Sequence, residues 1–223
     1  PERFKTAWDL LVADKGGLVF QPKPGIFENV AEIDFASMYP TIMAIHNISP
    51  ETVFCRCCEN HKVPEAGYTL CEKREGSVPK TLRPILTRRA WLKKMAKETE
   101  CRLQSAECGV EKENTKEGRR QEVGGRKTKK SESRMQKVES SENEAKKREI
   151  YDRKQTALKW MLVTCFGYLG YRNARFGRIE AHEAVTAFGR EKLLQAKEIC
   201  EEDGFELLHA ITDSLWIRKK NLR

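Results

Sequence analysis

The stretch Asp34-Phe35-Ala36-Ser37-Met38-Tyr39-Pro40 decides which fold the chain can adopt. Residues 30–34, which lead into it, place Ala31 and Ile33 on one side and Val30, Glu32 and Asp34 on the other, which predicts a short strand ending on a carboxylate. A carboxylate at a strand end can hold Mg²⁺ while backbone N–H groups of the following turn reach phosphate oxygens. Taken alone, the segment is more typical of an Asp that caps a helix starting near Ala36.

The composition predicts one or two domains and a polyanionic partner. The chain has 223 residues, with 42 Lys and Arg against 33 Asp and Glu, so its net charge is +9. Such an excess favours nucleic acid as the partner. Because the sequence contains neither an apolar run long enough to cross a bilayer nor a secretion signal, we expect no membrane contact and a cytoplasmic, nucleoid-associated location.

Three helices and two further strands are predicted beyond the opening strand. Residues 82–103 predict a basic helix, and residues 145–166 predict a second helix that returns antiparallel to the first. The low-complexity segment between them, about 107–145, predicts a disordered basic tip. A third helix is expected over 181–202, and residues 205–217 predict two strands hinged at Thr212 and Asp213.

The opening stretch resembles the first polymerase motif of family B DNA-directed DNA polymerases, Asp-x-x-Ser-Leu-Tyr-Pro-Ser. Asp34, Ser37, Tyr39 and Pro40 match it, and Met38 replaces Leu. The resemblance implies an α+β fold, in which helical-hairpin fingers are inserted into an antiparallel-sheet palm. It divides the chain into palm residues 1–81, fingers residues 82–168 and palm residues 169–223. We expect the thumb and exonuclease to come from a second polypeptide or a missing region, which makes this chain a fragment or a split subunit.

The second family motif, Lys-x-x-x-Asn-Ser-x-Tyr-Gly, lies on a fingers helix and aligns with residues 159–167. Lys159 and Gly167 match this motif, whereas Val163 and Phe166 stand in place of Asn and Tyr. A lysine beside an apolar stripe is ordinarily a solvated helix residue. In register with the first motif, the resemblance implies that Lys159 contacts the γ-phosphate of a nucleotide.

Two further cations are implied on the first fingers helix. The resemblance aligns the family's Arg and Lys with Arg89 and Lys93, which one helical turn brings to the same face. Together with Lys159 they would form a cationic cradle for a triphosphate. The alternative is a solvated basic face, and Arg88 and Lys94 are close enough for the register to shift by one residue.

The third family motif, Tyr-Gly-Asp-Thr-Asp-Ser at a hairpin turn, aligns with residues 209–214. Thr212, Asp213 and Ser214 match it, but Ile211 replaces the first Asp. The departures at Ile211 and Val163 resemble a divergent archaeal branch of the family.

The resemblance implies two-metal nucleotidyl transfer, in which deoxynucleoside triphosphates extend a primer on a template. Two Mg²⁺ ions, which Mn²⁺ can replace, would be held by Asp34, Asp213 and the Phe35 carbonyl. Tyr39 would stack under the sugar and exclude a 2′-hydroxyl. Besides the three cations, the implied nucleotide contacts are Phe35, Ser37, Met38 and Tyr39. The implied DNA contacts are Gly167, Tyr168, Arg172, Arg175 and Thr212.

Two other functions remain open. One is a non-catalytic relative that binds primer-template DNA or a replication partner, which Ile211 and Val163 favour. The other is a zinc-dependent nucleic-acid-binding module, which depends on a cysteine cluster that could bind Zn²⁺ through four thiolates or through three with His61. Relatives from hot habitats can carry a disulfide here, which would join Cys57 or Cys58 to Cys71, and reduced cysteines without a ligand are equally compatible. The cluster consists of Cys55, Cys57, Cys58 and Cys71.

Overall fold

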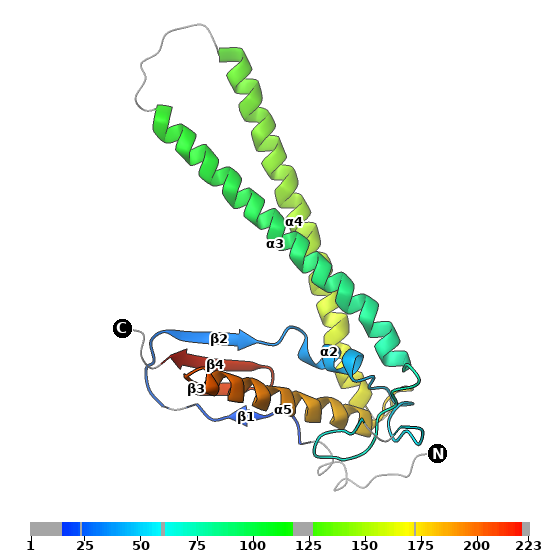
Figure 1. The fold of residues 1–223 in the computed structure, drawn as a ribbon. Coiled ribbons are helices and arrows are strands. Elements are labelled where there is room, and N and C mark those ends of the chain that lie inside the picture. The colour runs from blue at the N-terminus through cyan, green and yellow to red at the C-terminus, as the bar shows by residue number, and fades with distance from the viewer. Residues whose placement is uncertain (1–14, 23, 59–60, 118–126, 172, 220–223) are drawn as a thin grey trace. The chain divides into compact units, whose positions relative to one another are not determined.

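The computed structural model of the chain describes residues 15–22, 24–58, 61–117, 127–171 and 173–219, with side chains described outside 106–141 (Figure 1). The chain forms two compact units. The sheet unit comprises residues 1–86 and 161–223, and the hairpin unit comprises residues 87–160. The hairpin unit is shorter than the fingers region 82–168 expected from the sequence. Leu82, Leu162 and Leu169, at the ends of that region, are instead buried in the core of the sheet unit.

The sheet has four antiparallel strands in the order β1-β3-β4-β2. They are β1 (Val19–Phe20), β2 (Val30–Asp34), β3 (Phe205–Ile211) and β4 (Ser214–Lys219). Thr212 and Asp213 form the two-residue turn between β3 and β4, which is where the sequence predicted a hinge. The β2 strand, which the sequence placed at 30–34, lies at one edge and pairs only with β4 among the described strands.

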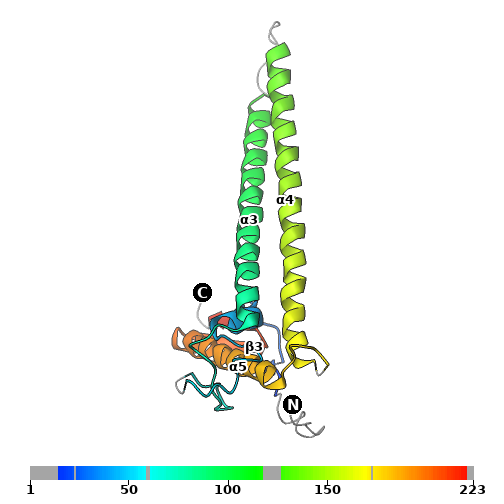
Figure 2. The ribbon, with the colours of Figure 1, turned by 90° about the vertical axis from the view of Figure 1, so that its right-hand side faces the viewer.

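One face of the sheet is covered by α5 (Ile179–Glu202), which Figures 1 and 2 show alongside β3 and β4. Leu193 of α5 packs with Ala210, Leu215 and Ile217 of the strands. The short helix α2 (Met38–Ile45) follows the opening stretch and also packs against α5. The core of the sheet unit therefore fixes the segment that starts at Asp34.

The hairpin unit consists of the long parts of α3 (Ser77–Glu117) and α4 (Lys127–Gly170), which run side by side (Figure 2). Arg148 forms an ion pair of 2.9 Å with Glu100, and the rings of Trp91 and Tyr151 meet edge to face at 6.0 Å. Because the contact partners run in opposite directions along the sequence, the helices are antiparallel, as the sequence predicted.

The predicted α+β fold is confirmed, with one difference at the hairpin tip. The structure continues the helices through 107–117 and 127–145, where the sequence predicted disorder, whereas residues 118–126 lie outside the described part. The Glu, Lys and Gln of these stretches have high intrinsic helix propensity, which a low content of apolar residues does not remove. Within the described residues, no helix combines the length and apolarity needed to span a membrane.

Candidate active site

Two turns of the sheet unit bring the predicted carboxylates together. Asp34 is the last residue of β2 and pairs with Ser214 of β4. The next residue, Phe35, donates its backbone N–H to the carbonyl of Asp213 over 2.9 Å. This bond continues the pairing of β2 with β4 into the turn that carries Asp213. Two loops that are distant in sequence are thereby joined by their backbones at the positions of the two carboxylates.

The strand register also fixes the face on which the site lies. Ile211, Ser214 and Asp34 form a row across β3, β4 and β2, because Ser214 pairs with both of the others. Residues directly opposite each other in an antiparallel pair project to the same face. The neighbouring residue Leu215 packs into the core beneath α5, and successive residues of a strand alternate between faces. Asp34 and Ile211 therefore lie on the face that α5 does not cover.

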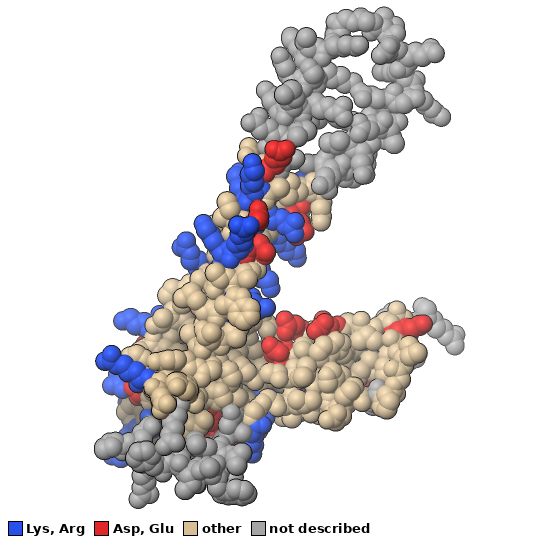
Figure 3. Space-filling model, turned by 180° about the vertical axis from the view of Figure 1, so that it is seen from behind, with Lys and Arg blue, Asp and Glu red and all other residues tan. Residues whose placement is uncertain are grey.

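Electrostatics link the two carboxylates. Burial and, after it, the negative charge of Asp34 raise the pKa of the Asp213 carboxyl above its ordinary value. Asp34 itself is exposed to solvent. Figure 3 shows acidic side chains gathered along one edge of the sheet unit. Two carboxylates of this kind form a site that a divalent cation would stabilise, because a cation relieves both the repulsion and the cost of burial.

Both carboxylate loops contain a residue other than glycine in the left-handed region. Ser37, at the start of α2, has a φ of 54°, and Thr212 has a φ of 52°. Backbone hydrogen bonds hold these conformations: Ser37 accepts from Thr41 over 3.0 Å, and Thr212 donates to Leu18 over 2.9 Å. Each such conformation costs about 1 kcal/mol or more and is concentrated at functional sites.

Tyr39 is held between aromatic and glycine neighbours. Its ring lies 4.3 Å from that of Phe166, and Phe166 stacks at 4.1 Å on His182. A Cβ at Gly189 of α5 would lie only 2.9 Å from the Tyr39 ring. The ring therefore has little freedom to move. Met38, by contrast, is buried in the core.

The three predicted phosphate-binding cations all belong to the hairpin unit. Arg89 and Lys93 are one helical turn apart on α3, so they lie on the same face, and Lys159 is exposed on α4. Lys94 forms an ion pair of 3.8 Å with Glu98, whereas no ion pair is found for Lys93 in the described part of the chain.

The predicted DNA contacts lie near the end of α4 and in the loops. Gly167 and Tyr168 lie on the last turns of α4, and the Tyr168 side chain is exposed. Arg175 lies in the loop before α5, with its guanidinium 5.6 Å from the Phe176 ring centroid. Arg172 lies outside the described residues.

A comparison with known proteins identifies the family of the chain. The sequence model of DNA polymerase family B matches residues 9–109 and 125–220. The chain belongs to DNA polymerase family B. Two archaeal members illustrate the match. DNA polymerase 2 of Saccharolobus solfataricus is 33% identical over 221 residues, which cover 99% of this chain and 26% of that protein. The DNA polymerase of Archaeoglobus fulgidus is 31% identical over 208 residues, covering 93% of this chain and 21% of that protein.

A solved structure of a family B polymerase supports the same assignment of the fold. The family B DNA polymerase from Pyrobaculum calidifontis matches with a TM-score of 0.60 and 27% identity, over 99% of this chain and 23% of that one. The chain thus spans about a quarter of the length of the relatives it matches. Within family B, the match covers both carboxylate turns and most of the hairpin.

The cysteine cluster of this family B chain is confirmed as a cluster, but without His61. The sulfur atoms of Cys55, Cys57, Cys58 and Cys71 lie within 4.8 Å of one another, and the four thiols are not joined by disulfides. The ring of His61 instead stacks on His46, with 3.3 Å between their nearest nitrogens. Burial, followed by the charge of His61, lowers the pKa of His46 to about 4, so His46 is neutral near pH 7.

Sequence reasoning missed three residues that position the family B site. Gly189 gives Tyr39 its space, His182 stacks on the Phe166 ring, and Glu51 accepts a hydrogen bond of 2.5 Å from the Ser77 N–H at the start of α3. Only Gly189 left a signal, because a glycine inside a helical pattern often marks a close approach of another element. The other two contacts join segments that are distant in sequence.

Proposed function

We propose that this chain carries the nucleotidyl-transfer site of a template-directed DNA polymerase. The observation that carries the proposal is the hydrogen bond from the Phe35 N–H to the Asp213 carbonyl, which holds two carboxylate turns together on an open face of the sheet. The named relatives are DNA polymerases, which supports DNA synthesis as the activity of the family. The complete reaction would also need the remaining polymerase regions, which another polypeptide or another part of the same protein would supply.

The residues present fit a pair of divalent cations. Asp34 and Asp213 offer hard oxygen ligands, and burial, followed by the negative charge of Asp34, raises the pKa of Asp213. The Phe35 carbonyl would be the third ligand. Two Mg²⁺ ions bound there, or Mn²⁺ in their place, would make the primer 3′-hydroxyl a better nucleophile and offset charge on the phosphates.

The other residues of the site would bind and orient the substrates. Arg89, Lys93 and Lys159 would hold the triphosphate, so that charge developing on the transferred phosphoryl group meets fixed cations. Tyr39 would lie under the sugar, where its restrained ring excludes a 2′-hydroxyl. The backbones of Phe35, Ser37 and Met38 would contact the nucleotide. Primer-template DNA would contact Gly167, Tyr168, Arg172, Arg175 and Thr212.

Removal of either carboxylate tests the proposal. In a primer-extension assay of the assembled enzyme, we expect Asp34→Ala and Asp213→Ala each to abolish nucleotide addition, because each loses a metal ligand. Circular dichroism should show an unchanged fold, because neither side chain belongs to the core. Asp203→Ala, at the end of α5, is the matched control and should retain activity. Undiminished extension by either site variant would refute the assignment.

The second candidate function is a non-catalytic polymerase relative that binds primer-template DNA or a replication partner. The observation that favours it is the place of Ile211, an apolar side chain in the same row and on the same face as Asp34. Such a protein would bind DNA in a salt-dependent manner but would show no extension with any divalent cation.

A further inference from the structure

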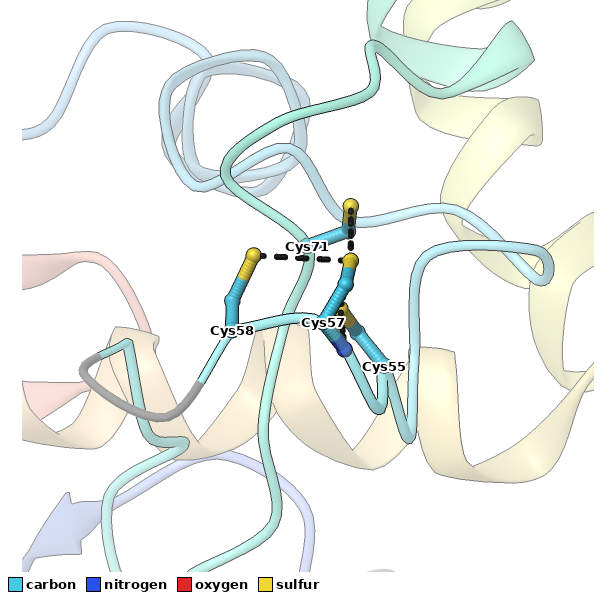
Figure 4. A group of neighbouring side chains, drawn as sticks. All are labelled: Cys55, Cys57, Cys58 and Cys71. Atoms are coloured by element: carbon cyan, nitrogen blue, oxygen red, sulfur yellow. Dashed lines mark hydrogen bonds between the residues drawn. The ribbon is translucent and has the colours of Figure 1, made fainter.

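Four thiols of the sheet unit converge on one point, with Cys57 exposed and with Cys58 and Cys71 buried. The Cys57 sulfur lies 3.6 Å from that of Cys58, 3.7 Å from that of Cys71 and 2.9 Å from that of Cys55 (Figure 4). All four sulfurs lie within 4.8 Å of one another. In a tetrahedral zinc centre with Zn–S bonds of about 2.3 Å, neighbouring sulfurs are about 3.8 Å apart. The spacing of the cluster approaches that of a four-thiolate centre.

Short backbone pairings bring these cysteines together. Val53 pairs with Leu70 in an antiparallel bridge, and Cys71 donates its N–H to the Thr52 carbonyl over 3.0 Å. The Thr69 hydroxyl donates to the Cys55 carbonyl over 2.7 Å. The two segments that carry the thiols are therefore fixed by the fold independently of any bond between sulfurs.

Backbone donors are already directed at three of the sulfurs. The N–H of Cys57 lies 3.3 Å from the Cys55 sulfur, and the N–H groups of Glu72 and Arg74 lie 3.4 Å from the sulfurs of Cys58 and Cys71. Hydrogen bonds of this kind orient metal ligands and stabilise the negative charge of a thiolate.

We propose that Cys55, Cys57, Cys58 and Cys71 bind one structural zinc ion. Four soft thiolates in a tetrahedral set select zinc over Mg²⁺ or Ca²⁺, and four protein ligands leave no open position for catalysis. A single disulfide would use only two of the four converging sulfurs. The basic residues Arg56, Lys73 and Arg74, which neighbour the cluster in sequence, would offset the net negative charge of a centre with four thiolates.

The zinc centre stabilises the connection from α2 to α3. Asn47, just after α2, donates to the carbonyls of Cys71 and Arg74 over 2.6 and 2.8 Å and accepts the Gly76 N–H over 2.8 Å. Gly76 immediately precedes α3. The metal therefore fixes a loop whose two ends are the carboxylate-bearing opening stretch and the first helix of the hairpin. This role does not depend on whether the chain is catalytic.

The test is a metal determination on the complete protein purified under reducing conditions without chelator. Mass spectrometry of metals should find about one zinc per chain, and Co²⁺ added to the metal-free protein should give the near-ultraviolet absorption of cobalt bound to thiolates. Cys57→Ser should lower the zinc affinity by more than about 100-fold, because loss of a direct ligand exceeds the loss of an outer-shell partner. Cys101→Ser, an exposed cysteine of the hairpin unit, should change nothing.

Because the Cys57 variant could fold poorly, thiol reactivity of the unaltered protein gives a second measurement. Zinc should protect four thiols from a thiol reagent, and removal of zinc should expose them without unfolding the hairpin unit. Absence of both zinc and the cobalt band would overturn the proposal. So would a disulfide from Cys57 or Cys58 to Cys71 in protein alkylated before purification, or equal loss of zinc from the Cys101 control.

Discussion

At the residue scale, Ile211, Ser214 and Asp34 form a row across the sheet beside the carboxylate turns. We expect this row to set the metal dependence of the proposed site. The sequence suggested that Ile211 and Asp213 project together as alternate residues of one strand. The structure differs, because β3 ends at Ile211 and Asp213 lies in the turn. Ile211 nevertheless shares a face with Asp34 through their common partner Ser214. The side chain at position 211 therefore still faces the proposed metal site.

Replacement of Ile211 by aspartate should strengthen metal binding. A carboxylate beside Asp34 would hold cations or order metal-bound water, and losses of such outer groups typically cost about 10–100-fold in affinity or activity. We expect the parent enzyme to extend primers slowly, with a need for raised Mg²⁺ or a benefit from Mn²⁺. Ile211→Asp should reach half-maximal activity at a Mg²⁺ concentration lower by about 10-fold or more. A primer-extension assay across a Mg²⁺ titration measures this shift.

Ile211→Asn is the matched control, because it has the size of aspartate but no charge. It should leave the Mg²⁺ requirement close to that of the parent. If the parent and Ile211→Asp both fail to extend a primer with any divalent cation and with the remaining polymerase regions present, the non-catalytic function becomes the better one.

At the element scale, the contact between α2 and α5 positions the Tyr39 ring. Gly189→Ala should destabilise the sheet unit by about 1–3 kcal/mol, because the added methyl group meets a ring that also packs against Phe166. Gly167→Ala is the matched control on α4, where a Cβ meets nothing within 4 Å. That change should be neutral or stabilising by up to about 1 kcal/mol. Denaturant unfolding measures both, and equal effects would contradict the packing argument.

The start of α3 depends on a charged cap from a distant loop. Burial raises the pKa of Glu51, but hydrogen bonds from the Ser49 hydroxyl and the Ser77 N–H outweigh it and lower this pKa to about 2. A depressed carboxyl pKa stabilises the fold above the unfolded value of about 4.3, and this contribution is lost as the pH falls towards 2.

Glu51→Gln should therefore lower the free energy of unfolding at pH 7 by about 1 kcal/mol, the typical contribution of a helix cap. The difference in free energy of unfolding between this variant and the parent should become smaller as the pH falls below about 4.3. Glu198→Gln, which removes an exposed charge on α5, should show a smaller effect at every pH. Thermal unfolding between pH 7 and pH 3 gives the comparison, and a difference that grows in acid would contradict the assigned pKa shift.

Local patterns predicted the elements of this fold better than the contacts between them. The strand ending at Asp34, the turn at Thr212 and Asp213 and the antiparallel helices each follow from a few consecutive residues and were correctly expected. The positions of Gly189, Glu51 and His61 depend on partners up to 150 residues away in the chain, and no local period encodes such pairings. The helical stretches 107–117 and 127–145 were missed because scarcity of apolar residues was given more weight than helix propensity.

At the scale of the whole molecule, the acidic and the basic residues of the proposed site belong to different units. The two proposed metal-binding carboxylates belong to the sheet unit, and the three proposed phosphate-binding cations belong to the hairpin unit. Ten further cations lie in residues 107–145, but nine Glu of the same stretch nearly balance them, so it contributes little to the net charge of +9. Cations that contact the nucleotide and cations that stay solvated should contribute differently to nucleotide binding, because solvated charges are screened by salt whereas a direct contact is screened much less.

Lys159→Ala should consequently raise the apparent KM for nucleotide by about 10-fold to 100-fold, the range expected for one hydrogen bond to a charged phosphate. Two controls accompany it: Lys154→Ala, an exposed lysine on the same helix, and the double variant Lys129→Ala, Lys130→Ala near the tip. Both should change KM by less than about threefold at 0.15 M salt, where interactions beyond about 8 Å are weak. Steady-state extension at several nucleotide concentrations separates the outcomes. Equal effects of Lys159→Ala and the tip variant would mean that the positive charge of the hairpin acts collectively, and the alignment that assigns Lys159 to the γ-phosphate would then be wrong.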